Sequence, residues 1–137
     1  MNLKNKYIVV IGAGESGVGA ALLAQKMGAN VFVSDFNLIK DDFRKELKEN
    51  GISYEENGHT LETIGKADLV IKSPGIPNKT AIIQFIKEAN ISMLSEIEFA
   101  STFSTAKTIC ITGSNGKTTT TMLVYHILQK AGYSVGF

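Results

Sequence analysis

Short apolar runs alternate with longer stretches of helical character along most of this chain. Six runs have the length of strands: Tyr7 to Ile11, Val31 to Ser34, Ile52 to Tyr54, Leu69 to Ile71, Ile91 to Leu94 and Thr108 to Ile111. They are nearly continuous in Val and Ile, which is typical of strands that helices bury on both faces. The pattern therefore predicts an α/β fold with a parallel sheet and right-handed crossovers.

The stretches between the runs carry helix signals. Apolar stripes at helical spacing include Leu22, Leu23 and Met27 in one stretch, and Ile82, Ile83, Phe85, Ile86 and Ala89 in another that Asn90 ends. Residues 41–50 form a further helix, with Gly51 at the position that favours a left-handed backbone. Residues 95–103 also look helical, because Ser95 and Glu98 have the spacing of a capping box.

A glycine motif follows the first strand. Residues 12–17 read Gly-Ala-Gly-Glu-Ser-Gly, and Asp35 ends the second strand 18 residues beyond Gly17. This order of strand, glycine turn, helix and acidic residue is typical of a site for NAD or FAD. The glycines serve a tight turn and close approach of an anion, so any ligand that carries a diphosphate fits the pattern. Glu15 must turn its carboxylate outward to avoid repelling such a ligand.

A second glycine-rich loop follows the run at 108–111. Its sequence, Thr-Gly-Ser-Asn-Gly-Lys-Thr-Thr-Thr at 112–120, indicates a phosphate-binding loop whose N–H groups surround phosphate oxygens. Lys117 would neutralise the outer phosphates, and the Thr118 hydroxyl would hold magnesium. Only two residues separate Gly113 from Gly116, fewer than in the commonest form. The alternative is an ordinary strand-to-helix turn capped by a side chain.

A third landmark is Ser73-Pro74-Gly75-Ile76 after the fourth strand. It lies at the carboxyl end of a strand, where open α/β sheets bind ligands. Pro74 and Gly75 also fit a plain tight turn with a positive φ at Gly75. Both interpretations stay open from the sequence.

Composition adds few constraints. The chain has 137 residues, with 14 basic and 13 acidic side chains, so nothing indicates nucleic acid or an anionic membrane surface as a partner. The apolar runs are far shorter than the roughly 18 residues of a membrane span, and a secretory signal pattern is absent, which predicts a cytoplasmic protein. Cys110 is expected in a buried strand as a small core residue, and both histidines are expected in surface or packing roles.

Small and polar residues near 101–107 interrupt the pattern. We therefore expect a Rossmann-like, doubly wound domain over residues 1–104, followed at 105–137 by the first strand, phosphate loop and helix of an ATP-binding domain. The second segment is short for a domain, so we expect the chain to be the N-terminal part of a longer protein. We expect residues 108–137 either to pack against the first domain or to pair with another copy of the chain.

These landmarks together resemble the Mur ligases of peptidoglycan synthesis, in particular those that add D-glutamate. The resemblance rests on the motif at 12–17, Asp35, the segments at 73–76 and 95–99, and the shortened loop at 112–119. It implies that the first domain binds the UDP of UDP-N-acetylmuramoyl-L-alanine rather than a redox cofactor. The implied UDP contacts are Gly14, Glu15, Ser16 and Gly17 at the diphosphate, and Asp35, Phe36 and Gly75 at the uridine.

The resemblance also implies the reaction and its cofactors, ATP and Mg²⁺. The substrate carboxylate attacks the γ-phosphate to give an acyl phosphate, which the amine of D-glutamate then attacks. Lys117 would be the catalytic residue, Thr118 the magnesium ligand, and the ATP contacts Gly113, Ser114, Asn115, Gly116, Lys117, Thr118 and Thr119. Members have further domains, so we expect this chain alone to be inactive and the full-length protein to be a monomer.

Three alternatives remain from the sequence. The first is an NAD-binding sensor or regulatory module in which the loop at 112–120 is only structural, although such a turn has no need for Lys117. The second is another Mur ligase. The third is a folate polyglutamate ligase, which shares the ATP loop but is not expected to begin with a glycine-motif UDP domain.

Overall fold

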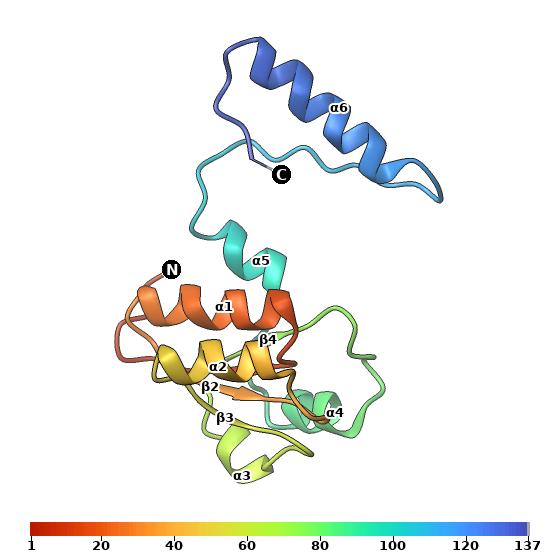
Figure 1. Ribbon diagram of the computed structural model, residues 1–137. Helices are drawn as coiled ribbons and strands as arrows, with labels where there is room; N and C mark the ends of the chain where they lie inside the picture. Colours follow the sequence, from red (N-terminus) through yellow and green to blue (C-terminus); the bar gives the residue numbers. More distant parts are fainter. Residues whose placement is uncertain (137) are drawn as a thin grey trace. The chain divides into compact units, whose positions relative to one another are not determined.

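A computed structural model describes residues 1–136 of the chain (Figure 1). The structure divides between Ser104 and Thr105 into two compact units.

The first unit is built on a five-stranded parallel sheet. Its strands are β1 (Tyr7–Ile11), β2 (Asn30–Ser34), β3 (Ser53–Glu55), β4 (Leu69–Lys72) and β5 (Met93–Ser95). They lie in the order β3-β2-β1-β4-β5, and every neighbouring pair is parallel. The expected parallel α/β fold is therefore confirmed.

Helices cover both faces of this sheet (Figure 1). They are α1 (Glu15–Lys26), α2 (Asp41–Glu49), α3 (Leu61–Ile64), α4 (Ala81–Glu88) and α5 (Glu96–Ser101). Ile8 and Val10 of β1 lie in one core with residues of α1, α2 and α5, whereas Val9 and Ile11 lie in a second core with residues of α3 and α4. Successive residues of a strand point to opposite faces, so two cores explain why β1 is apolar without interruption.

The helix ends follow the sequence signals. The Ser95 hydroxyl accepts a hydrogen bond from the Glu98 N–H at 3.2 Å, and the Glu98 carboxylate accepts one from the Ser95 N–H at 2.8 Å. Gly51 and Asn90 adopt φ values of 66° and 54° just after α2 and α4. The capping box and both helix stops are confirmed. The four-residue helix α3 was not expected, because one turn is too short to show a helical period.

Two strands begin later than the apolar pattern predicts. The Ile52 N–H donates to the Leu47 carbonyl at 2.9 Å, and the Ile91 N–H donates to the Ile86 carbonyl at 3.1 Å. Both N–H groups therefore satisfy the carboxyl ends of α2 and α4 rather than a neighbouring strand. For this reason β3 and β5 start one or two residues after these isoleucines.

The second unit contains one helix, α6 (Lys117–Lys130). The expected strand at 108–111 is wrong, because these residues form no strand, and Cys110 is exposed rather than buried. A strand needs a neighbour for its N–H and C=O groups, and residues 105–136 contain no other strand. Residues 134–136 are not a strand either, and the rest of that expected element, residue 137, lies outside the described residues. Within residues 1–136, no helix has both the length and the apolar character needed to cross a bilayer.

Candidate functional site

The main cavity of the first unit lies where the strand order of the sheet reverses. Strand β1 pairs with both β2 and β4, so the loops that leave these three strands meet at one edge. They border a cavity of about 620 Å³. Its lining residues are Gly12, Gly14, Asp35, Phe36, Asn37, His59, Ser73, Gly75, Ile76, Pro77, Thr80, Ala81 and Ile82.

The structure brings part of the expected UDP site together. Gly14, Asp35, Phe36 and Gly75 all line the main cavity. Glu15 instead borders an adjoining hollow of about 310 Å³, which Gly14 and Asp35 also line. Ser16 and Gly17 line neither hollow. The uridine candidates are therefore gathered around one space, which the diphosphate candidate Gly14 also lines, while Glu15, Ser16 and Gly17 lie on the first turn of α1.

The glycine turn packs too tightly for side chains at two positions. A Cβ atom on Gly12, whose φ is 100°, would lie 2.9 Å from the Ser73 Cβ. A Cβ atom on Gly17 would lie only 2.0 Å from the Gly12 carbonyl oxygen. The buried Gly17 therefore lets α1 begin directly against the turn, and its role in the structure is close packing.

The start of α1 is suited to an anion. Its N-cap residue, Gly14, provides no side-chain hydrogen bond. The N–H groups of the first helical turn have no acceptor within the helix, and the helix dipole places partial positive charge there. Backbone groups at residues 15–17 can therefore bind phosphate oxygens without any basic side chain.

Asp35 holds the glycine turn in place. Its carboxylate accepts hydrogen bonds from the Ala13 N–H at 2.7 Å and from the Asn37 N–H at 2.8 Å. The side chain thus joins the loop after β1 to the loop after β2. The predicted contact of Asp35 with a ligand comes in addition to this structural role.

The buried Glu96 links the starts of α1 and α5 to the loop after β4. The Ser16 hydroxyl donates to its carboxylate at 3.1 Å, and the Ser73 hydroxyl donates to the same oxygen. The hydroxyl of Ser16, expected to donate to a diphosphate, is therefore committed to Glu96 in this structure. The sequence drew attention to Glu96 only as part of the segment at 95–99.

The turn at Ser73 to Ile76 differs from the expected type. The Ile76 N–H donates to the Ser73 carbonyl at 3.1 Å, which closes a four-residue turn. Gly75 does not adopt a positive φ, so the expectation of a left-handed glycine there is wrong. A type I turn has this hydrogen bond and needs no positive φ at its third residue. A Cβ on Gly75 would meet no atom within 4 Å.

His59 is a site residue that the sequence did not reveal. Its imidazole lines the cavity, and its Nδ1 lies 2.7 Å from the hydroxyl of the buried Ser34. That hydroxyl also lies 2.6 Å from a carboxylate oxygen of Glu55, which accepts a hydrogen bond from the Thr60 N–H at 2.9 Å. Ser34 and Glu55 are direct neighbours in the register of β2 and β3. A sequence pattern does not show this pairing, because strand register depends on the fold.

The surroundings shift the pKa values of two of these groups. Burial lowers the pKa of His59, although the charges of Glu55 and Asp35 act in the opposite direction. Burial of Glu55 disfavours its ionisation, but hydrogen bonds from Ser34 and Thr60 and the nearby His59 outweigh it and lower the pKa of the carboxyl. At neutral pH the pair is therefore a neutral imidazole and an ionised carboxylate.

This pKa shift predicts a pH-dependent stability. An unfolded chain binds a proton at histidine near pH 6.5, whereas folded His59 resists protonation until a lower pH. The free energy of unfolding should therefore fall as the pH is lowered from 7.5 to 5.5. Urea denaturation across this range should show the fall in the wild type and a smaller one in His59→Phe. An equal pH dependence in both proteins would contradict this assignment.

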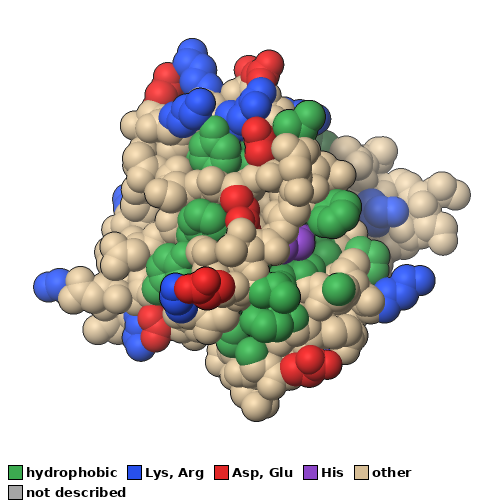
Figure 2. Space-filling model, turned by 90° about the horizontal axis from the view of Figure 1, so that it is seen from below, with side chains coloured by type: hydrophobic (Ala, Val, Ile, Leu, Met, Phe, Trp, Pro, Cys, Tyr) green, Lys and Arg blue, Asp and Glu red, His purple; other side chains and the backbone are tan. Residues whose placement is uncertain are grey.

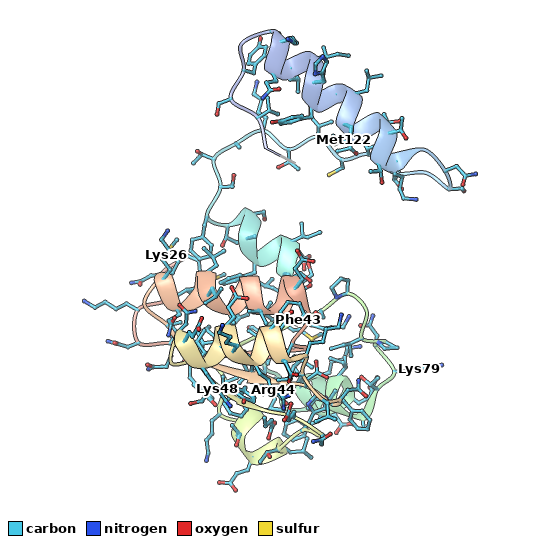
Figure 3. The ribbon with its side chains drawn as sticks, viewed as in Figure 1. Lys26, Phe43, Arg44, Lys48, Lys79 and Met122 are labelled. Carbon is cyan, nitrogen blue, oxygen red and sulfur yellow. The ribbon has the colours of Figure 1, made fainter. Side chains whose placement is uncertain are left out.

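Basic side chains are absent from the lining of the main cavity. Lys and Arg do not occur among its lining residues, all of which lie in the described part of the chain. Arg44 of α2 binds Glu56 at 3.2 Å, and the exposed Lys79 points away from the body of the unit (Figure 3). Figure 2 shows a face on which hydrophobic side chains gather around a histidine. An apolar wall with few polar groups suits a flat, uncharged ring.

The loop before α6 has the features of a phosphate site. Gly116, at φ 75°, is the N-cap of α6, and no side chain caps the helix. The Lys117 ammonium donates to the carbonyls of Gly113 and Ser114 at 2.6 and 3.4 Å, so it reaches back across the loop. Thr118 is exposed on the first turn. The structure therefore contradicts the alternative in which a side chain caps this turn.

Two parts of the chain match known protein families. Residues 7–82 match the MurD N-terminal domain, and residues 111–137 match the Mur ligase middle domain. A protein of Bacteroides fragilis named UDP-N-acetylmuramoylalanine–D-glutamate ligase is 56% identical over 131 residues. A protein of the same name from Porphyromonas gingivalis is 56% identical over 132 residues. The matches cover 96% of this chain but only 30% and 29% of these relatives.

Solved structures of two peptide ligases are also similar to this chain. A pseudomurein peptide ligase type C from Methanothermus fervidus superposes with a TM-score of 0.63 at 34% identity. A murein peptide ligase from Psychrobacter arcticus superposes with a TM-score of 0.68 at 28% identity. Each match covers 93% of this chain and 27% of the other protein.

Proposed function

This chain belongs to the MurD N-terminal domain family of Mur ligases, and we propose that it provides the UDP-binding site and the ATP loop of a ligase that joins D-glutamate to UDP-N-acetylmuramoyl-L-alanine. The chain spans about 30% of the length of the curated relatives it matches. We therefore propose the ligase activity for a full-length protein that carries these residues. We propose that this protein acts in the cytoplasm.

One observation supports the UDP site above all others. Gly14, Asp35, Phe36 and Gly75 come from three separate loops, and all four line a single cavity next to an uncapped helix start. A nucleoside fits the apolar cavity, while the N–H groups of residues 15–17 receive the diphosphate. We propose that the uridine of the substrate lies in the cavity and that its diphosphate lies at the start of α1.

The phosphate loop would act by position and charge. The uncapped start of α6 offers N–H groups to the phosphates of ATP, and the Lys117 ammonium would leave its carbonyl partners to neutralise charge on the transferring phosphoryl group. In the proposed reaction the substrate carboxylate attacks the γ-phosphate and displaces ADP. The D-glutamate amine then attacks the carbonyl carbon of the acyl phosphate and loses a proton. The amide forms as phosphate leaves.

Magnesium is compatible with this loop. Among residues 1–136, no cluster of three or more His, Cys, Asp or Glu side chains could hold a metal ion. The Thr118 hydroxyl offers one oxygen ligand, and Mg²⁺ commonly takes most of its remaining ligands from phosphates and water. Bound Mg²⁺ would neutralise phosphate charge. We therefore propose Thr118 as a ligand in the ATP complex.

Calorimetric titration of the chain with UDP and, separately, with NAD tests the proposed site. Saturable binding of UDP with no response to NAD is the expected result. Binding of NAD without UDP would overturn the proposal and favour an NAD-binding module. An Asp35→Ala variant is a poor probe, because it also removes the acceptor of two loop N–H groups.

Phe36 offers a cleaner test. This residue is 70% exposed and lines the cavity, so removal of its ring should leave the fold intact. Loss of an aromatic ring that stacks on a base costs about 1–3 kcal/mol, and we expect Phe36→Ala to weaken UDP binding about tenfold. Ile97→Ala is the matched control, because Ile97 is 78% exposed on α5 and lines no part of the cavity. Equal affinity in both variants would contradict stacking on Phe36.

A further inference from the structure

The cluster of Glu55, Ser34 and His59 fixes which nitrogen of the histidine carries its proton. An ionised carboxylate only accepts hydrogen bonds, so the single proton of the Ser34 hydroxyl is donated to Glu55. The hydroxyl oxygen then accepts a hydrogen bond, and the group 2.7 Å away is Nδ1 of His59. The imidazole must therefore be protonated at Nδ1. Its other nitrogen, Nε2, is left as an acceptor.

The position of this imidazole is fixed by the backbone as well as by Ser34. The Asn57 N–H donates to the Asn37 carbonyl, and the Gly58 N–H donates to the Asp35 carbonyl, each at 3.3 Å. These bonds attach the loop after β3 to the loop after β2. The imidazole ring also lies 6.0 Å from the Phe36 ring, centroid to centroid.

His59 differs from Asp35 and Ser73, two other polar residues around the cavity. Both carboxylate oxygens of Asp35 already accept backbone hydrogen bonds, and the Ser73 hydroxyl donates to Glu96. His59 instead offers a neutral hydrogen-bond acceptor, Nε2, on a ring that is held in place at an apolar wall. Such a group favours a ligand with a hydrogen-bond donor at that place, since a ligand without the donor leaves the acceptor unpaired.

We propose that His59 is a specificity-determining residue of the UDP site, and that its Nε2 accepts a hydrogen bond from the uridine. Two groups of uridine provide such a donor, the N3–H of the base and the hydroxyls of the ribose. Ser34 and Glu55 are positioning residues that act through the tautomer of His59. This inference rests on the proposed UDP-binding function.

The tautomer is tested first, without any ligand. Nitrogen-15 NMR of the imidazole rings should show a protonated Nδ1 and an unprotonated Nε2 for His59, whose signals disappear in His59→Phe. The exposed His126 on α6 provides the internal comparison. In Ser34→Ala, His59 should shift toward the Nε2-protonated form that free histidine prefers. Protonation at Nε2 in the wild type would overturn the inference, whether or not the chain binds UDP.

Binding tests the second step. We expect His59→Phe to weaken UDP binding about tenfold, and the control His126→Phe to leave it unchanged. Titration with 3-methyl-UDP, 2′-deoxy-UDP and 3′-deoxy-UDP then identifies the donor, because the analogue without it should bind the wild type and His59→Phe equally. Unchanged UDP affinity in His59→Phe would overturn the role of His59 alone. Absence of UDP binding in the wild type would overturn the proposed function itself.

Discussion

Replacing Lys117 by alanine is expected to lower the turnover of a full-length ligase carrying this segment by roughly 10³-fold, because the ammonium would no longer offset charge on the transferring phosphoryl group. The side chain is exposed, and its ammonium donates to two carbonyls of its own loop. The fold should therefore be unaffected. Phosphate release that depends on D-glutamate, at saturating ATP, measures the effect.

Lys130 provides the matched control for this prediction. It is an exposed lysine in the last turn of the same helix, far along α6 from the loop. Lys130→Ala should keep wild-type turnover. If Lys117→Ala retained more than about a tenth of the activity, a role for Lys117 at the phosphoryl group would be untenable.

Replacing Gly17 by alanine should destabilise the first unit by about 3 kcal/mol or more, since the new methyl group would overlap the Gly12 carbonyl oxygen. The Gly12 backbone cannot move freely, because its N–H donates to the Ser34 carbonyl at 2.9 Å. Displacement of α1 from the turn should also abolish UDP binding. Urea denaturation, followed by circular dichroism, measures the loss of stability.

Gly19 gives the opposite expectation two residues further along the same helix. A Cβ on Gly19 would meet no atom within 4 Å. Because alanine has a higher helix propensity than glycine, Gly19→Ala should stabilise the unit by about 0.5–1 kcal/mol. Similar stability of the two variants would mean that Gly17 is not needed for close packing.

Much of the first unit could be predicted from the sequence because its signals are local. A continuous apolar run such as Tyr7 to Ile11 indicates a strand buried on both faces, and the structure confirms it. The capping box at Ser95 and Glu98 uses groups only three residues apart. The glycine motif at 12–17 predicted a tight turn between β1 and α1, and the approach of Gly17 to Gly12 is its physical basis.

The second unit shows where such signals fail. The residues at 108–111 have the composition of a strand, yet they form none, and Cys110 is exposed. An apolar run indicates only that a segment gains stability when other surfaces bury it. Pairing depends on a neighbouring strand, which the described residues 105–136 do not contain.

The sequence by itself determined the five strands of the first unit, its longer helices and its glycine turn, because each depends on residues close together along the chain. The tertiary structure alone decided that His59 belongs to the cavity. The tautomer that we propose for it depends on Ser34 and Glu55, which become neighbours only when β2 and β3 pair in one register. Register and loop packing are set by the whole core, so short sequence patterns do not encode them.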